Sequence, residues 1–332
     1  YGSVSGKKSN EDGEDLGGAL IGIFQTGTTE YTKENAIATA TSEDDGSFSF
    51  EEVPYGTWVI REIESPKGYV LSEEEISVTI SEVDEVVEVE LVNYFITGNI
   101  ALTKVDKDYP ENKLTGAVFE VYSDTNEDGK LDKKDELLGE MGEVEKGVYQ
   151  MDDLRYGKYL VREKTAPTGF VLDENIYPVS IEENGKTYNV ENEAGKGFLN
   201  EAQKGSLKIV KTSSDGKVEG FSFRVIGKDY DQTFTTDKKG EITVEGLRIG
   251  EYTVSEVNDK ASSGYILPAD QKVTIKTDET ATVTMHNELR DTPKTGDDFS
   301  LGLWVSLAAA FTLGAGIFGF VGYKSGRKKK ED

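Results

Sequence analysis

The residues best able to do chemistry in this chain are a lysine, a glutamate and an asparagine that recur together three times. A neutral lysine amine can attack the side-chain amide carbon of an asparagine while a protonated glutamate relays the proton. Ammonia then leaves, and an amide joins the two side chains. The recurring sets are Lys8, Glu62 and Asn93; Lys104, Glu163 and Asn200; and Lys211, Glu256 and Asn287.

Strand alternation predicts that these side chains face inward. Residues two apart in a β-strand share one face of the sheet. Glu163 therefore shares its face with the apolar residues Tyr159 and Val161. The same parity holds for the other glutamates, the lysines and the asparagines, although it is weaker for Lys8, whose strand holds small residues.

Burial would bring these groups into their reactive forms. A buried charge is costly, so burial lowers the pKa of lysine and raises that of glutamate until the pair is neutral or salt-bridged. The alternative to reaction is an unreacted Lys–Glu ion pair inside the fold. The asparagine would then be an ordinary hydrogen-bonding neighbour.

The elements that must hold these sets are short strands in a threefold repeat. Each copy opens with a glycine six residues before its lysine, continues through alternating segments such as 47–50 and 241–244, and then reaches its glutamate. Alternating strands with turn-rich connections over about 100 residues predict a β-sandwich. The predicted domains are 1–96, 97–203 and 204–290.

The segments around the glutamates carry a family resemblance. They read Tyr55-Gly-Thr-Trp-Val-Ile-Arg-Glu62, Tyr156-Gly-Lys-Tyr-Leu-Val-Arg-Glu163 and Ile249-Gly-Glu-Tyr-Thr-Val-Ser-Glu256, and two continue as Ser65-Pro-Lys-Gly-Tyr69 and Ala166-Pro-Thr-Gly-Phe170. With these spacings, residues 1 to about 290 resemble the Cna B-type, or SpaA-like, domains of Gram-positive surface proteins and pilins. The third copy departs from the pattern, because 258–265 lacks the proline and is two residues longer. The resemblance implies an all-β fold of three tandem Ig-like, prealbumin-like β-sandwiches.

The resemblance also implies an autocatalytic isopeptide bond in each domain, formed without a cofactor. Lys8 would join Asn93 with help from Glu62, Lys104 would join Asn200 with help from Glu163, and Lys211 would join Asn287 with help from Glu256. These bonds would close loops of 85, 96 and 76 residues. In the chain-entropy model, each cross-link stabilises its domain by about 4 to 5 kcal/mol.

The second domain contains an inserted acidic loop at 124–135. The loop fits the twelve-residue calcium pattern, with Asp instead of Glu at the last position, and resembles the dockerin form of that loop. The predicted Ca²⁺ ligands are Asp124, Asn126, Asp128, the Lys130 carbonyl, Asp135 and, through water, Asp132. The alternative is a solvated hairpin, because Asp, Asn and Gly also favour turns.

The C-terminal part predicts a transmembrane helix. Residues 299–323 carry no charge and exceed the roughly 20 residues that cross a bilayer. The basic segment 324–332 follows, so the positive-inside rule predicts a cytoplasmic tail and places residues 1–298 outside. Those outer residues hold 32 basic and 61 acidic side chains, which would repel nucleic acid. The chain opens at Tyr1 without the signal peptide that export requires, so we expect a trimmed N-terminus.

A sorting motif precedes this span within the linker 291–298. It consists of Thr292, Pro293, Lys294, Thr295 and Gly296. The motif resembles the LPxTG signal, with Thr in place of Leu, and the order of motif, span and basic tail completes the three-part pattern. The resemblance implies that a sortase cysteine attacks the Thr295 carbonyl and passes the chain to an amine of peptidoglycan or of a pilus subunit. The alternative is a span that stays in the membrane.

Little in the sequence favours an enzyme that acts on an external substrate. Cysteine is absent, and His286, the single histidine, is expected on a strand surface. The sequence predicts a structural or adhesive protein anchored to the Gram-positive cell wall, or a minor pilin, with a host or matrix ligand that it does not identify. A shaft role is disfavoured, because neither Tyr109-Pro110 nor Tyr177-Pro178 continues with the lysine of the shaft motif. The alternative is the anchoring stalk of a larger surface enzyme whose catalytic domain lies upstream of residue 1.

Overall fold

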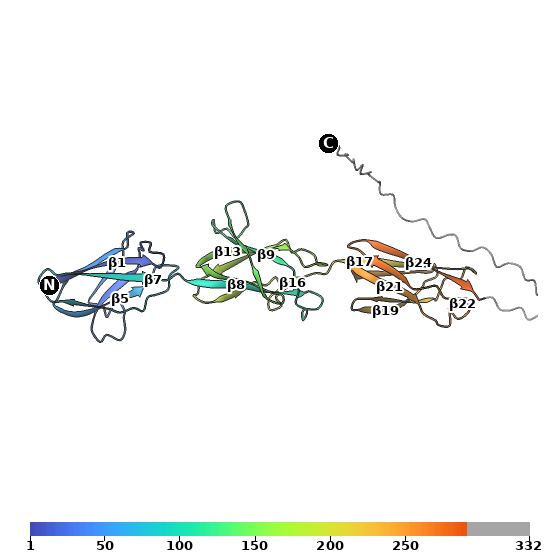
Figure 1. Ribbon diagram of the computed structural model, residues 1–332, viewed down its shortest axis with the longest axis horizontal. Helices are drawn as coiled ribbons and strands as arrows, with labels where there is room; N and C mark the ends of the chain where they lie inside the picture. The colour runs from blue at the N-terminus through green and yellow to red at the C-terminus, as the bar shows by residue number, and fades with distance from the viewer. Residues whose placement is uncertain (291–332) are drawn as a thin grey trace, which may run out of the picture. The chain divides into compact units, whose positions relative to one another are not determined.

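The computed structural model describes residues 1–290, which form β-strands and no helix. One compact unit, Tyr1–Leu289, contains three pairs of sheets in chain order (Figure 1). We call them domain 1 (β1 to β7), domain 2 (β8 to β16) and domain 3 (β17 to β24). The prediction of an all-β chain of successive sandwiches is confirmed for these residues. Within residues 1–290, no helix has the length and hydropathy needed to cross a bilayer.

Domain 1 pairs a sheet in the order β4-β1-β7 with a sheet in the order β3-β2-β5-β6. Its strands are β1 (Gly2–Asn10), β2 (Leu20–Gln25), β3 (Ala38–Thr41), β4 (Ser47–Val53), β5 (Gly56–Glu64), β6 (Ile76–Ile80) and β7 (Val86–Asn93). Alternation along β4 turns Phe48 and Phe50 into the core. A Cβ at Gly6 would overlap the Phe48 ring, so this glycine makes room for the core beside the lysine.

Domain 2 pairs a sheet in the order β10-β9-β13-β14 with a sheet in the order β11-β12-β8-β15, in which β16 also pairs with β8. Its strands are β8 (Thr97–Asp106), β9 (Val118–Ser123), β10 (Glu136–Glu140), β11 (Gly142–Glu145), β12 (Val148–Arg155), β13 (Gly157–Thr165), β14 (Ile176–Ile181), β15 (Thr187–Asn189) and β16 (Phe198–Asn200). The core centres on Phe119, whose ring lies 5.2 Å from that of Tyr149 and 5.0 Å from that of Phe198.

Domain 3 pairs a sheet in the order β20-β17-β24-β22 with a sheet in the order β19-β18-β21-β23. Its strands are β17 (Lys204–Ser213), β18 (Ser222–Gly227), β19 (Tyr230–Thr235), β20 (Glu241–Arg248), β21 (Gly250–Glu256), β22 (Tyr265–Ile266), β23 (Gln271–Ile275) and β24 (Thr280–Leu289). Phe221 and Phe223 anchor its core.

In every domain the first and last strands run parallel and side by side. Thus β1 pairs with β7, β8 with β15 and β16, and β17 with β24. Within these ladders Lys8 lies opposite Leu91, Lys104 opposite Phe198 and Lys211 opposite Met285. Each asparagine lies two residues beyond its lysine's partner, which puts both side chains on one face of the sheet.

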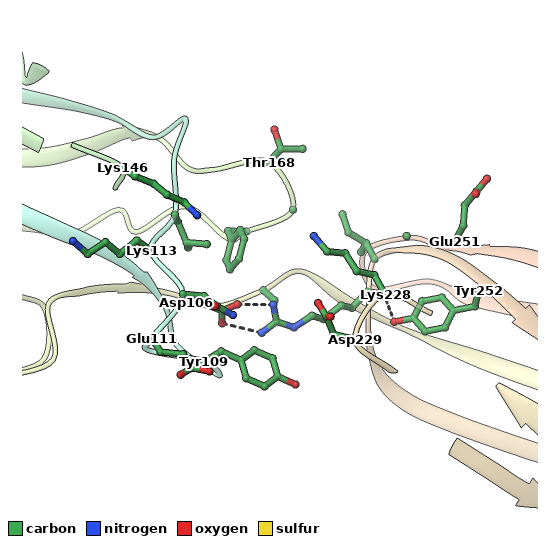
Figure 2. A pocket seen from close by; sticks show the side chains of 18 residues that line it. Asp106, Tyr109, Glu111, Lys113, Lys146, Thr168, Lys228, Asp229, Glu251 and Tyr252 are labelled. Atoms are coloured by element: carbon green, nitrogen blue, oxygen red, sulfur yellow. Dashed lines mark hydrogen bonds and ion pairs between the residues drawn. The ribbon is translucent and has the colours of Figure 1, made fainter. Parts of the chain in front are cut away.

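Arginines in corresponding places connect successive domains. Arg155 lies two residues before the start of β13, the strand of Glu163, and Arg248 lies two residues before the start of β21, the strand of Glu256. Arg155 donates to Asp12 of domain 1 at 2.7 Å. Arg248 donates to both carboxylate oxygens of the buried Asp106 of domain 2, at 2.6 and 2.8 Å, and to Asp108 at 2.9 Å. Figure 2 shows the second junction, an open groove lined by both domains, with dashed lines at Asp106.

Candidate functional sites

In domain 2 the lysine, glutamate and asparagine meet inside the sandwich. Lys104 lies on β8 and Asn200 on the adjacent β16, whereas Glu163 comes from β13 in the facing sheet. The Lys104 Nζ contacts Asn200 Oδ1 and lies 3.1 Å from Glu163 Oε1. The Asn200 Nδ2 donates to both Glu163 oxygens, at 3.0 and 2.9 Å. The Lys104 amine therefore contacts the carbonyl oxygen of the Asn200 carboxamide, and the Glu163 carboxylate contacts the nitrogen of the same carboxamide.

Domain 1 has a looser version of this arrangement. The Lys8 Nζ lies 3.6 Å from Glu62 Oε1. The Asn93 Nδ2 donates to Glu62 Oε2 at 2.7 Å and to the Val70 carbonyl at 2.6 Å. All three side chains of the set are at most 1% exposed, and Lys8 Nζ, Glu62 Oε1 and Asn93 Oδ1 have no hydrogen-bond partner. Buried polar atoms are normally hydrogen-bonded, so these three unpaired atoms are unusual for a protein interior.

Domain 3 keeps the Glu–Asn contact but turns the lysine away. The Asn287 Nδ2 donates to Glu256 Oε1 at 2.5 Å. The Lys211 Nζ donates to the carbonyl of its neighbour Thr212 at 2.6 Å and lies 4.5 Å from the centre of the Phe221 ring. A lysine side chain has several rotatable bonds, so a change of rotamer would be needed to bring this amine to the asparagine.

The strand register explains why the three side chains meet. Lysine and asparagine are diagonal neighbours on one face of a parallel ladder, and the long lysine side chain spans the offset. Glutamate enters from the facing sheet, about 10 Å away across the core. The same residue types at the same repeat positions therefore produce three buried sites, one in each domain.

Burial shifts the lysines towards the neutral amine. Desolvation lowers the pKa of Lys104 to about 8, against the opposing attraction of Glu163. Desolvation also lowers the pKa of Lys8 and of Lys211, and it raises the pKa of Glu256. These shifts increase the fractions of neutral amine and protonated acid, which are the forms that acyl transfer needs.

Backbone donors hold two of the three carboxylates, and our sequence analysis missed them. The Ser72 N–H donates to Glu62 Oε2 at 2.7 Å, and the Asp173 N–H donates to Glu163 Oε2 at 2.8 Å. Both donors lie ten residues after their glutamate, a shared spacing that could have identified them. In domain 3, where the corresponding loop is longer, Glu256 Oε2 has no hydrogen-bond partner.

The predicted calcium loop connects β9 and β10. Its buried Asp124 accepts hydrogen bonds from the N–H groups of Asp128 and Gly129, at 3.2 and 2.9 Å. The Asp132 N–H donates to Asp135 at 2.7 Å. In the described part of the chain, no group of three or more His, Cys, Asp or Glu side chains is arranged to hold a metal ion. Calcium binding by this loop stays a prediction.

The remaining predicted residues lie elsewhere. His286 is exposed on β24, where its ring contacts Thr212 and Glu288, and its predicted place on a strand surface is confirmed. The sorting motif 292–296, the span 299–323 and the basic tail 324–332 lie outside the described residues.

Comparison with known proteins identifies a family. A family model described as SpaA, prealbumin-like fold domain, matches residues 2–94, 98–196 and 205–289. No curated protein matches the chain.

Several solved structures are similar to this chain to different degrees. The Bacillus anthracis TIE protein is similar at 25% identity with a TM-score of 0.69; the match covers 86% of this chain and 50% of that one, so this chain spans half of its length. BcpA, the major pilin subunit of Bacillus cereus, matches at 14% identity and a TM-score of 0.41, covering 87% of this chain and 99% of that one. The full-length major pilin SpaD from Corynebacterium diphtheriae matches at 15% identity with a TM-score of 0.27. That match covers 88% of this chain and 98% of that one.

Proposed function

Because the chain belongs to the SpaA prealbumin-like fold domain family and carries three such domains in tandem, we propose that it is a pilin-like structural protein of the Gram-positive cell surface, with each domain locked by a Lys–Asn isopeptide bond. One observation carries this proposal. In all three domains, a lysine, a glutamate and an asparagine from two facing sheets are buried in the same place.

The chemistry uses only side chains of the chain itself. A proton passes from the lysine ammonium to the glutamate carboxylate, which gives a neutral amine and a neutral acid. The amine attacks the asparagine Cγ, and the acid protonates the departing nitrogen, which leaves as ammonia. The new amide nitrogen keeps one of its two protons. The other passes through the glutamate to the departing ammonia, which carries it away as ammonium, so the glutamate ends as the carboxylate that it was at the start. No oxidant, metal or water is consumed.

The geometry supplies orientation for this reaction. In domain 2 the carboxamide contacts the amine at its oxygen and the glutamate at its nitrogen, so both reaction partners are in place before the bond forms. Groups held in a near-attack arrangement react with effective molarities of about 10⁵ M or more. Folding would thus supply the orientation that this single-turnover reaction needs.

The position of the bond suits a load-bearing role. Each bond would link the first strand of a domain to the parallel last strand, close to the ends of both strands. Force that enters domain 1 at Gly2 would travel along β1 to Lys8, cross to Asn93 and leave the domain. The residues between Lys8 and Asn93 would carry little of it. Domains closed in this way would resist extension without disulfides, in keeping with the absence of cysteine.

Attachment to the cell wall completes the proposal and rests on the sequence. A sortase would cleave the chain between Thr295 and Gly296 and join Thr295 to an amine of peptidoglycan or of another pilus subunit. The mature protein would then be extracellular and covalently anchored, after transient insertion through residues 299–323.

Peptide mapping tests the bonds one by one. The protein is unfolded, digested and analysed by tandem mass spectrometry, with the expectation of three branched peptides that join Lys8 to Asn93, Lys104 to Asn200 and Lys211 to Asn287. Recovery of all six residues in linear peptides would contradict the proposal.

A further inference from the structure

The last strand of domain 2 is interrupted, unlike those of its neighbours. In domains 1 and 3 the asparagine lies on a continuous last strand of eight and ten residues. In domain 2 that strand splits into β15 and β16, each of three residues, with 190–197 between them. Asn200 therefore ends a strand whose ladder with β8 pairs only three residues. So short a strand needs additional support to hold a reacting group.

Asn192, in the interruption, supplies this support. Its Oδ1 accepts from the Leu199 N–H at 2.8 Å, and its Nδ2 donates to the Leu199 carbonyl at 2.7 Å. The carboxamide thus bonds to both backbone groups of Leu199, as a neighbouring strand would. Because Leu199 directly precedes Asn200, this clamp fixes the backbone next to the reacting side chain.

The same side chain is also linked to the acid. The Asn192 Nδ2 donates to Asp173 Oδ2 at 3.0 Å, and the Asp173 backbone N–H donates to Glu163 Oε2 at 2.8 Å. Tyr177 donates to the same Asp173 oxygen at 2.7 Å. Asn192 therefore joins the strand that carries the acceptor amide to the loop that orients the glutamate.

We propose that Asn192 is a positioning residue for the bond between Lys104 and Asn200. This inference rests on the proposed function, because it presupposes that the bond forms. Asn192 touches none of the reacting atoms and acts through Leu199 and Asp173. The Asn192 carboxamide accepts from the Leu199 N–H and donates to its carbonyl, whereas an ionised aspartate, although of the same shape, would keep the first contact and lose the second.

The test follows bond formation in the full-length chain after translation in vitro. Samples are denatured at intervals and digested, and the ratio of branched to linear peptide is measured for each domain. We expect Asn192→Asp and Asn192→Ala to slow the domain 2 bond at least tenfold. The bonds of domains 1 and 3 serve as internal controls and should form at the wild-type rate.

Asn175→Asp is the matched control. Asn175 also donates to Asp173, at 2.7 Å, but it is exposed and makes no contact with Leu199 among the described hydrogen bonds. This variant should leave all three rates unchanged. If it slows the domain 2 bond as much as Asn192→Asp does, added charge beside Asp173 explains the effect and the proposal fails.

Two other results would overturn the inference. A wild-type rate for the domain 2 bond in both Asn192 variants would show that the clamp does not position Asn200. A domain 2 that is less resistant to trypsin in both variants than in Glu163→Gln, which is also expected to be unlinked, would show that Asn192 serves the fold itself. By contrast, wild-type protein that yields no branched peptide from domain 2 would contradict the proposed function, a separate and recognisable outcome.

Discussion

Replacing Glu163 by glutamine should remove the acid of domain 2 while keeping the shape of its side chain. Glutamine can still accept the hydrogen bond that the Asp173 N–H makes in the native protein. It cannot take a proton from Lys104 or return one to the leaving nitrogen. We therefore expect domain 2 of Glu163→Gln to fold with Lys104 and Asn200 unlinked, and the variant to retain one ammonia that the wild-type protein has lost.

The loss of stability can be estimated from the loop that the bond closes. Between 104 and 200 the loop spans 96 residues, for which the chain-entropy model gives about 4.7 kcal/mol. In a domain of about 100 residues, 1 kcal/mol shifts the melting midpoint by roughly 4 to 8 °C. The midpoint of domain 2 should therefore fall by roughly 20 to 40 °C.

Scanning calorimetry and intact-mass measurement on residues 1–298 provide the assay. The exposed Glu182 offers a control, since Glu182→Gln makes the same chemical change away from the site. It should leave both mass deficit and midpoint as in the wild-type protein. Glu163→Gln protein that still lacks the ammonia of domain 2, or that melts within a few degrees of the control, would refute the reasoning.

Further predictions follow from the structure and from the sequence. The reactive pair of neutral Lys104 and protonated Glu163 holds as many protons as the ion pair, so the rate of bond formation in domain 2 should fall roughly tenfold per pH unit above about pH 8, where Lys104 loses its proton. A rate that climbs through pH 8 in quenched time courses would contradict this. Arg248→Ala should broaden spin-label distances between domains 2 and 3, because it removes the arginine that pairs with the charge of the buried Asp106. Arg155→Ala should broaden the distances between domains 1 and 2 less, because the half-exposed ion pair of Arg155 with Asp12 is worth under about 1 kcal/mol. Equal broadening in the two variants would contradict this difference between the junctions. Calcium should protect 124–135 from proteolysis and Asp128→Ala should abolish that protection, whereas identical digestion with calcium and with chelator would indicate a plain hairpin. In cells, Thr295→Ala should move the protein from the wall to the membrane or medium, and complete detergent extraction of wild-type protein with its basic tail attached would exclude sorting.

Much of the architecture was accessible from the sequence, because alternation in short strands is a strong signal. The apolar residues that alternate with Glu163 and Lys104 predicted inward-facing side chains, and both side chains are buried. Small residues weakened that signal around Lys8. The structure explains one of them, since Gly6 accommodates the ring of Phe48 from the neighbouring strand, a contact that strand parity alone does not contain.

Other features could not be predicted because they depend on three-dimensional contacts between distant residues. The interruption of the last strand in domain 2 is supported by Asn192, seven residues from Leu199 and 19 from Asp173. The orientation of Lys211 is a choice between rotamers inside a packed core. Neither leaves a periodic pattern in the sequence, and the junction arginines likewise contact carboxylates more than 140 residues away.

The central claim is that these domains are covalently closed, and an intact-mass measurement tests it most directly. Protein comprising residues 1–298 is purified, fully denatured and weighed by electrospray mass spectrometry. The account predicts a mass below that calculated from the sequence by the mass of three ammonia molecules. A mass equal to the calculated value would contradict it.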